Sequence, residues 1–284
     1  EPPLRFDSMQ HWFGWFGPDD PLDLARLTPA GAGGVTLRPQ PTAGSRPGPI
    51  LKEIRMRRSQ DDADLFAAMR RTLFTAVVGD VLDKMGLQHQ FLPPRLRPLR
   101  PDMVVLGRAM PVLEADVYAE TAAGHNPLSA KPFGLMFQAL DSLKPNDVYV
   151  CTGASPRYAL WGELMSTRAI HLQAAGAVLD GYVRDTNGIL ALHFATFGLG
   201  SYAQDQGPRG KVVDFGLPIE IDGIRIRPGD ILFGDIDGVV VIPREAEDEA
   251  IARAFDKAET ENKVRTAIAA GMSTVEAFET FGVM

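Results

Sequence analysis

The chain has 284 residues, of which 45% are hydrophobic and 23% are charged, and this ordinary globular composition excludes wholesale disorder. The formal net charge of −7 argues against a general binder of nucleic acids or anionic membranes, and the single cysteine, Cys151, excludes an internal disulfide framework. No apolar run approaches the roughly 20 residues that cross a bilayer, and no signal peptide is evident, so we expect a cytoplasmic protein.

Residues 1–59 differ in amino-acid composition from the rest of the chain. They are rich in proline and glycine, contain Trp12 and Trp15, and include an irregular, linker-like run at 41–49. We therefore expect an N-terminal arm and linker over 1–59, followed by one α/β domain over 60–284.

Beyond residue 60, hydrophobic periodicity predicts helices and strands in alternation. Helices are predicted at 61–71, 75–85, 132–143, 161–174 and 245–270. Strands are predicted at 104–112, 148–151, 177–180, 211–221, 224–226, 231–233 and 239–242. Asp222-Gly223 and Asp237-Gly238 are turn signals between the last strands and indicate hairpins.

Residues 148–185 form one predicted β-α-β unit. In such a unit the start of the helix and the end of the second strand lie at the same edge of the sheet, which brings Gly162, Glu163, Leu164 and Met165 near Arg184-Asp185. The free amides of a helix start favour an anion, and an arginine can hold a carboxylate through two parallel hydrogen bonds.

Carboxylates at the same place point to a hard metal ion. Asp185 and Glu163 carry oxygen ligands suited to Mg²⁺, directly or through water, so the group could form a pocket for a metal-bound 2-oxo acid. The alternative is purely structural, because Arg-Asp pairs at strand ends are common on surfaces and a glutamate in the first turn often only complements the helix dipole.

Five stretches resemble the RraA-like family, which includes the regulator of ribonuclease activity A and the 4-hydroxy-4-methyl-2-oxoglutarate aldolases. They run in family order and are TAVVGDVLDKMG at 75–86, LRPDMVVLGRA at 99–109, WGELM at 161–165, DGYVRD at 180–185 and RPGDILFGDIDGVVVIP at 227–243. The resemblance implies a β/β/α sandwich of the swivelling phosphohistidine-domain type, and a homotrimer or hexamer with active sites between subunits.

The aldolase branch of the family has an acidic residue separated by twenty residues from an Arg-Asp pair. Glu163 and Arg184-Asp185 keep this gap (positions 164 to 183), although the family pattern has aspartate at the first place. The resemblance therefore implies a Mg²⁺- or Mn²⁺-dependent lyase that cleaves a 4-hydroxy-2-oxo acid to pyruvate and also decarboxylates oxaloacetate.

Each site residue has an expected role in this reaction. Asp185 would anchor the metal, and Glu163 would bind it and transfer a proton through an ordered water. Arg184 and the amides of Leu164 and Met165, next to Gly162, would hold the pyruvyl end. The resemblance also implies an acidic group on the terminal helix, and we favour Glu261 over Glu259 for this role. It is equally well possible that both glutamates lie on a solvated helix face and have no role at the site.

Two further questions stay open at the level of sequence. His125, in a polar loop, could touch the substrate, although a lone loop histidine more often has no chemical role; together with Lys131 it is a candidate for the distal half of the pocket. The competing functions are a non-catalytic trimer that binds a ribonuclease, and another lyase or hydratase acting on an acidic metabolite.

Overall fold

The computed structural model describes residues 62–117, 125 and 127–283, so the predicted arm at 1–59 lies outside the described residues. Within that part, eight strands form the main sheet, and four others form two small sheets. The main sheet contains β1 (Arg97–Pro98), β2 (Val105–Asp116), β3 (Asp147–Thr152), β5 (Gly176–Leu179), β7 (Thr196–Gly198), β8 (Gly210–Phe215), β11 (Ile231–Asp235) and β12 (Gly238–Ile242). The small sheets pair β4 (Ala159–Trp161) with β6 (Tyr182–Val183) and β9 (Ile219–Ile221) with β10 (Ile224–Ile226).

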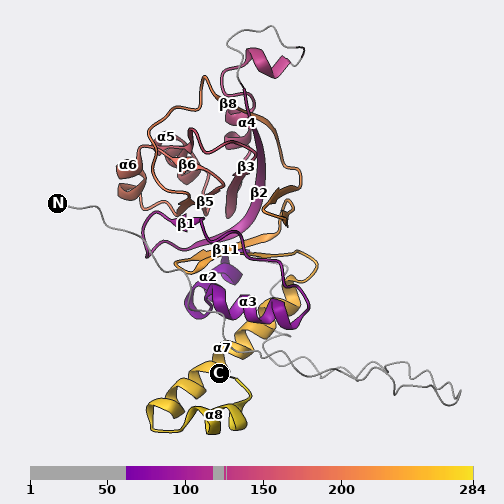
Figure 1. The fold of residues 1–284 in the computed structure, drawn as a ribbon, viewed down its shortest axis with the longest axis vertical. Helices are drawn as coiled ribbons and strands as arrows, with labels where there is room; N and C mark the ends of the chain where they lie inside the picture. The colour runs from indigo at the N-terminus through magenta and orange to yellow at the C-terminus, as the bar shows by residue number, and fades with distance from the viewer. Residues whose placement is uncertain (1–61, 118–124, 126, 284) are drawn as a thin grey trace, which may run out of the picture. The chain divides into compact units, whose positions relative to one another are not determined.

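The long strand β2 organises the main sheet (Figure 1). It pairs in parallel with β3 on one side, and on the other it pairs antiparallel with β11 along its first half and with β8 along its second. β5 and β7 continue the parallel part beyond β3. The amide of Leu92 donates to Val239 of β12, and β1 a few residues later pairs with β7, so one short segment bridges both ends and the sheet is nearly closed.

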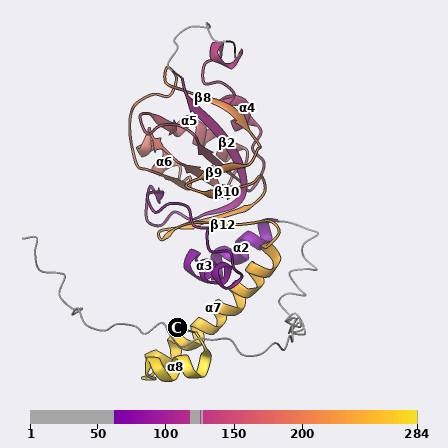
Figure 2. The same cartoon turned by 45° about the vertical axis from the view of Figure 1, so that its right-hand side comes forward.

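The two faces of the parallel strands contact different layers, because successive side chains alternate in direction. Tyr149 and Cys151 belong to a buried cluster with α4 (Met136–Asp141), α5 (Glu163–His171) and α6 (Thr186–Ala191). Val148 and Val150 belong to a second cluster with the β9–β10 hairpin. Hairpin, sheet and helices therefore lie in three layers, which confirms the predicted α/β class, and Figure 2 shows the hairpin and these helices around the same strands. The narrower assignment to the phosphohistidine-domain type stays a prediction.

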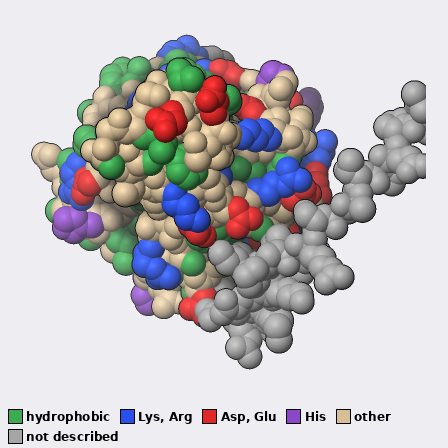
Figure 3. Space-filling model, turned by 90° about the horizontal axis from the view of Figure 1, so that it is seen from below, with side chains coloured by type: hydrophobic (Ala, Val, Ile, Leu, Met, Phe, Trp, Pro, Cys, Tyr) green, Lys and Arg blue, Asp and Glu red, His purple; other side chains and the backbone are tan. Residues whose placement is uncertain are grey.

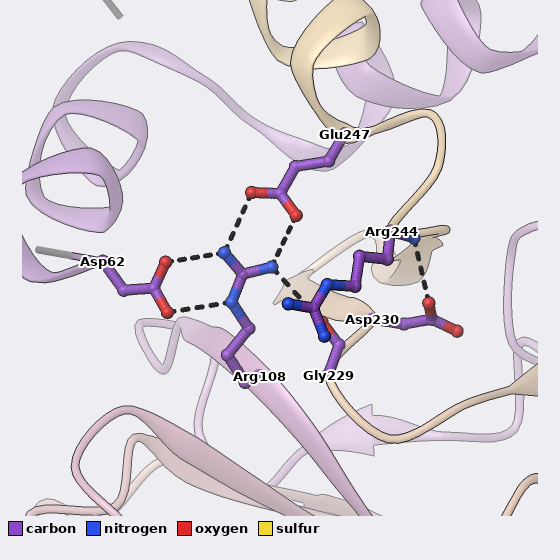
Figure 4. A network of polar contacts seen from close by, with 6 residues as sticks. All are labelled: Asp62, Arg108, Gly229, Asp230, Arg244 and Glu247. Atoms are coloured by element: carbon purple, nitrogen blue, oxygen red, sulfur yellow. Dashed lines mark hydrogen bonds and ion pairs between the residues drawn. The ribbon is translucent and has the colours of Figure 1, made fainter. Parts of the chain in front are cut away.

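A third cluster covers the antiparallel strands β11 and β12. It is formed by α2 (Asp62–Thr72), α3 (Thr75–Lys84) and α7 (Glu247–Ala269), and α8 (Thr274–Phe281) follows α7. Arg108 of β2 ties these helices to the sheet by pairing with Asp62 and Glu247, each at 2.6 Å (Figure 4). Across the described ranges, no helix combines the length and the apolarity that a membrane crossing requires.

The face of the molecule drawn in Figure 3 carries basic and acidic side chains interspersed with apolar ones. This face presents no extended field of one sign.

The long predicted helices and the hairpins are confirmed, and the differences have local causes. The helix predicted at 132–143 begins only at Met136, because Phe133 and Gly134 have φ values of 57° and 63°, outside the helical region. The strand predicted at 211–221 is two strands, because Gly216 has a φ of 72° and Pro218 lacks the amide hydrogen that a ladder needs.

Candidate active site

The two segments predicted to form the site meet through a small parallel sheet. Tyr182 and Val183 of β6 pair with β4, whose last residue, Trp161, accepts a hydrogen bond from the Arg184 amide at 2.9 Å. The second half of the predicted β-α-β unit therefore holds two strands: β5 lies in the main sheet, and β6 pairs with β4 instead. The pairing of β6 with β4, rather than the main sheet, places Arg184-Asp185 beside the start of α5.

Gly162 allows the two segments to approach closely. It is buried at the N-cap of α5, and a Cβ atom there would lie 2.9 Å from Asp185 Oδ2 and 3.6 Å from Arg184 Cγ. Any larger residue would push the Asp185 carboxylate away from the helix start. The predicted grouping of Gly162 with Arg184-Asp185 is thus present in the fold.

The first turn of α5 is held by a buried hydrogen-bond chain. Trp161 Nε1 donates to Ser166 Oγ at 2.7 Å, and Ser166 Oγ donates to the Gly162 carbonyl at 3.2 Å. Amides in the first turn of a helix have no partner inside the helix, so those of Leu164 and Met165 can serve a ligand. The Leu164 side chain is 83% exposed, whereas Met165 packs partly against the core.

Asp185 has an unusual backbone conformation. It is the N-cap of α6 with φ 54° and ψ 35°, a left-handed conformation that aspartate tolerates better than most residues. Its side chain makes no capping hydrogen bond, is about half exposed, and lies 3.7 Å from Arg184 Nε. Within the described ranges the carboxylate has no other polar partner, so it retains the capacity to bind a cation.

Glu163 lies against the first turn of α6. A Cβ atom on Gly188, three residues after Asp185, would lie 2.3 Å from Glu163 Oε2, so the side chain crosses from α5 to α6. Glu163 is exposed, and no described residue pairs with its carboxylate. Two carboxylates without strong protein partners, on adjacent helix starts, fit Mg²⁺, which keeps several waters and takes one or two carboxylates.

A fully protein-built metal cage is absent from the described part of the chain, where no three His, Cys, Asp or Glu side chains converge on one point. The donor set therefore fits an ion bound by few protein oxygens, and it does not fit a structural metal centre. Among the carboxylates of one protomer, Asp185 and Glu163 are the pair at this site that such an ion would use.

The remaining predicted residues lie elsewhere in the protomer. Glu261 is on α7, where it pairs with Lys257, which also reaches Asp80 of α3 at 3.1 Å. Figures 1 and 2 show α7 on the other side of β11 and β12 from α5 and α6. Glu259 pairs with Lys263 on the same helix. His125 is exposed, and no contact among the described residues joins it to Arg184.

Sequence reasoning missed Asp205, the strongest partner of the site arginine. Arg184 Nη1 donates to Asp205 Oδ1 at 2.6 Å, from a loop that follows β7. Neither spacing nor a motif signals this pair, because the loop between β7 and β8 has no regular periodicity. Only the folded chain brings the two residues together.

A second polar cluster that the sequence did not reveal lies at the end of β2. The Tyr158 hydroxyl donates to Asp116 at 3.0 Å, and the buried Glu114 lies beside Cys151, with 3.9 Å between Sγ and Oε2. Burial, with the negative charge of Asp116 contributing, raises the pKa of Glu114 to about 8. Glu114 is thus a protonated acid at neutral pH, next to an aspartate whose pKa hydrogen bonds hold below its usual range despite partial burial.

Comparison with known proteins adds an independent line of evidence. The family model RraA-like (Aldolase/RraA) matches residues 75–241, more than half of the chain. A Halalkalibacterium halodurans protein named "Putative 4-hydroxy-4-methyl-2-oxoglutarate aldolase" is 32% identical over 222 residues, covering 78% of this chain and 96% of that protein.

Two further matches bear on length and fold. Protein DlpA of Legionella pneumophila is 27% identical over 208 residues; the match covers 73% of this chain but only 32% of DlpA, so the chain spans about a third of that relative. The crystal structure of Streptomyces coelicolor RraAS2, described as an unusual member of the RNase ES inhibitor RraA protein family, has a TM-score of 0.61 at 22% identity, covering 72% of this chain and 97% of that one. At this identity the likeness supports the mixed α/β fold.

Proposed function

Because the chain belongs to the RraA-like (Aldolase/RraA) family, we propose that it is a divalent-metal-dependent lyase that cleaves a 4-hydroxy-2-oxo acid to pyruvate and a second carbonyl compound. The observation that carries the proposal is the meeting of Glu163, Arg184 and Asp185 at the starts of α5 and α6. Arg184 can bind the carboxylate of a 2-oxo acid. The Glu163 and Asp185 carboxylates, which lack strong protein partners, can hold the metal ion that such an acid chelates.

Asp185, with Glu163, would hold Mg²⁺ or Mn²⁺. Such an ion, when bound, supplies Lewis-acid stabilisation of the charge that develops on the 2-oxo oxygen. The substitution of glutamate for the aspartate of the family pattern at 163 moves that carboxylate by about one bond, and the contact of Glu163 with Gly188 accommodates the longer side chain.

The other residues bind the substrate and move protons. Arg184 and the amides of Leu164 and Met165 bind the pyruvyl carboxylate. Glu163 accepts the proton of the 4-hydroxyl group, through a water, as the C3–C4 bond breaks; the electron pair of that bond stays on the pyruvyl fragment, and the proton returns to its C3. Arg184 stabilises the negative charge on that fragment. Loss of CO₂ from oxaloacetate leaves the same fragment, so we propose this decarboxylation as a second activity.

The assembly forms part of the proposal. We propose a homotrimer or hexamer in which a second copy supplies Glu261, because in one protomer that residue lies on the far side of β11 and β12 from α5. In the same arrangement, His125 and Lys131 would be available to the distal half of the pocket, which selects the substrate.

Removal of metal tests the proposed chemistry. We expect EDTA to abolish pyruvate release from 4-hydroxy-2-oxo acids, and Mg²⁺ or Mn²⁺ to restore it, in an assay coupled to lactate dehydrogenase. Arg184→Lys and Asp185→Asn should each lower kcat/KM by about 100-fold or more, because each removes a charge or a bidentate contact at the reacting centre.

Two outcomes would contradict this function. Trapping of pyruvate on the protein by borohydride would indicate a Schiff-base lysine instead of a metal. Capture of ribonuclease E in a pull-down, with no turnover of any 4-hydroxy-2-oxo acid, would favour a non-catalytic regulator.

A further inference from the structure

We propose that Asp205 is a positioning residue that fixes the Arg184 guanidinium in the orientation that binds the carboxylate of a 2-oxo acid. The inference rests on the proposed function and adds a residue that neither the motifs nor the comparisons indicate. It assigns a role to the loop between β7 and β8.

The guanidinium lies between two carboxylates from different segments. Asp205 Oδ1 accepts from Nη1 at 2.6 Å, and Asp185 Oδ2 lies 3.7 Å from Nε. Among the described residues, none pairs with Nη2. Both N–H groups of Nη2 and the second N–H of Nη1 are therefore left for an incoming carboxylate, in the parallel geometry that arginine prefers.

Asp205 is itself held in place by its own loop. Its second oxygen, Oδ2, accepts from the Gly207 amide at 3.0 Å, and its carbonyl accepts from Arg209 Nη1 at 3.0 Å. The neighbouring Gln204 carbonyl accepts from the Ala159 amide at 2.9 Å, which ties the loop to β4 of the site. The aspartate thus offers Arg184 a rigid acceptor rather than a mobile surface carboxylate.

Positioning matters here because the Arg184 side chain is 40% exposed. A free arginine side chain has many rotamers, and a ligand would otherwise have to overcome part of that entropy on binding. A fixed guanidinium binds the same carboxylate with a smaller loss of entropy.

Loss of Asp205 should change the affinity for an anionic ligand in opposite directions under the two possible roles of this carboxylate. A negative charge next to Arg184 should, by simple repulsion, weaken the binding of an anionic ligand, so loss of that charge would strengthen binding. Positioning predicts the opposite, because without Asp205 the guanidinium loses its orientation.

The test compares pyruvate affinity across variants of the full chain by NMR titration in the presence of MgCl₂. Asp205→Asn removes the charge and leaves one oxygen acceptor for the two donors, Arg184 and the Gly207 amide, whereas Asp205→Ala removes the charge and both acceptors. Charged hydrogen bonds are about twice as strong as neutral ones, so we expect dissociation constants raised about threefold for Asp205→Asn and about tenfold for Asp205→Ala. Glu279→Gln, which removes one exposed charge from α8, is the matched control and should not change the affinity.

A double-mutant cycle separates positioning from general damage to the fold. In an Arg184→Lys background, Asp205→Ala should cause no further loss of affinity, because there is no guanidinium to orient. Thermal unfolding midpoints report whether each variant folds, and Asp205→Asn, which keeps the size of the side chain, provides the result if Asp205→Ala does not fold.

The possible results distinguish failure of the positioning role of Asp205 from failure of the proposed function. Pyruvate binding by wild type that Asp205→Asn leaves unchanged or strengthens would overturn the positioning role alone. Equal losses in the wild-type and Arg184→Lys backgrounds would do the same. Absence of pyruvate binding by folded wild type would overturn the proposed function and this inference together.

Discussion

At the scale of single residues, Glu114 should make the free energy of unfolding depend on pH. Its pKa in the folded protein is about 8, against an ordinary value of 4.5, because burial disfavours the charged carboxylate. The folded state therefore binds this proton more tightly than the unfolded chain. The resulting stabilisation is complete below about pH 4.5 and is lost as the pH rises to about 8.

Replacement of this carboxyl by an amide should remove that dependence. We expect Glu114→Gln to have a free energy of unfolding that changes less between pH 5 and pH 8 than that of wild type, by at most about 1.4 kcal/mol per pH unit. Urea unfolding at a series of pH values measures the difference. The exposed control Glu279→Gln should follow wild type, and an identical pH profile for Glu114→Gln would show that Glu114 titrates normally.

A substitution at Gly188 should change the activity and the stability of the protein in opposite directions. A Cβ atom there would lie 2.3 Å from Glu163 Oε2, so Gly188→Ala must displace the Glu163 side chain, which is flexible and exposed. We expect kcat/KM to fall about 10- to 100-fold, because a shift of about 1 Å in a reacting group has effects of this size. The free energy of unfolding should rise by up to about 1 kcal/mol, because alanine favours a helix over glycine.

The adjacent exposed position provides the control for this variant. Asn187→Ala also adds helix propensity to α6, and Asn187 is exposed. It should stabilise the protein slightly and keep its activity. An active Gly188→Ala would remove Glu163 from the proton-transfer step.

At the scale of elements, Arg108 joins α2 and α7 to β2 (Figure 4). It pairs with Asp62 and with Glu247, whose side chain is only 3% exposed. Arg108→Ala leaves that carboxylate buried without a cation, and we expect it to lower the free energy of unfolding by about 3 to 5 kcal/mol. Chemical denaturation of the variant and of wild type gives this difference.

Two variants check the cause of that loss. Arg253→Ala breaks an exposed pair with Glu249 on α7 and should cost no more than about 1 kcal/mol, because surface ion pairs contribute little. Arg108→Met combined with Glu247→Leu should recover much of the stability, because it removes the buried charge as well as its partner. If Arg108→Ala and Arg253→Ala cost the same, burial of Glu247 does not govern the effect.

Helices and strands were predicted correctly from the sequence where the hydrophobic pattern ran over many residues, and they were missed where the element was short. The helices at 75–85 and 245–270 and the hairpin around Asp222-Gly223 were predicted because each has a sustained pattern or a specific turn signal. β4, β6 and α6 were missed, because two to six residues give too few repeats for a period to be recognised. These three short elements, together with the start of α5, position the candidate site.

At the scale of the whole molecule, the layers were predictable and the closure of the main sheet was not. The alternation of Val148 and Val150 with Tyr149 and Cys151 requires cover on both faces of the sheet, which the hairpin and the helices provide. The near closure depends on residues 90–98 bridging β12 and β7, and this segment has no strand pattern of its own.

The sequence by itself determined the family and the α/β class, and it predicted the grouping of Glu163 with Arg184-Asp185, because motif order and the connection between the two segments are properties of a short stretch of chain. Only the tertiary structure decided that β6 leaves the main sheet to join β4, that Asp205 binds Arg184, and that Glu114 is buried as an acid. These features arise from contacts between residues 21 to 42 positions apart, where packing, burial and the local dielectric, rather than any sequence period, set the energies.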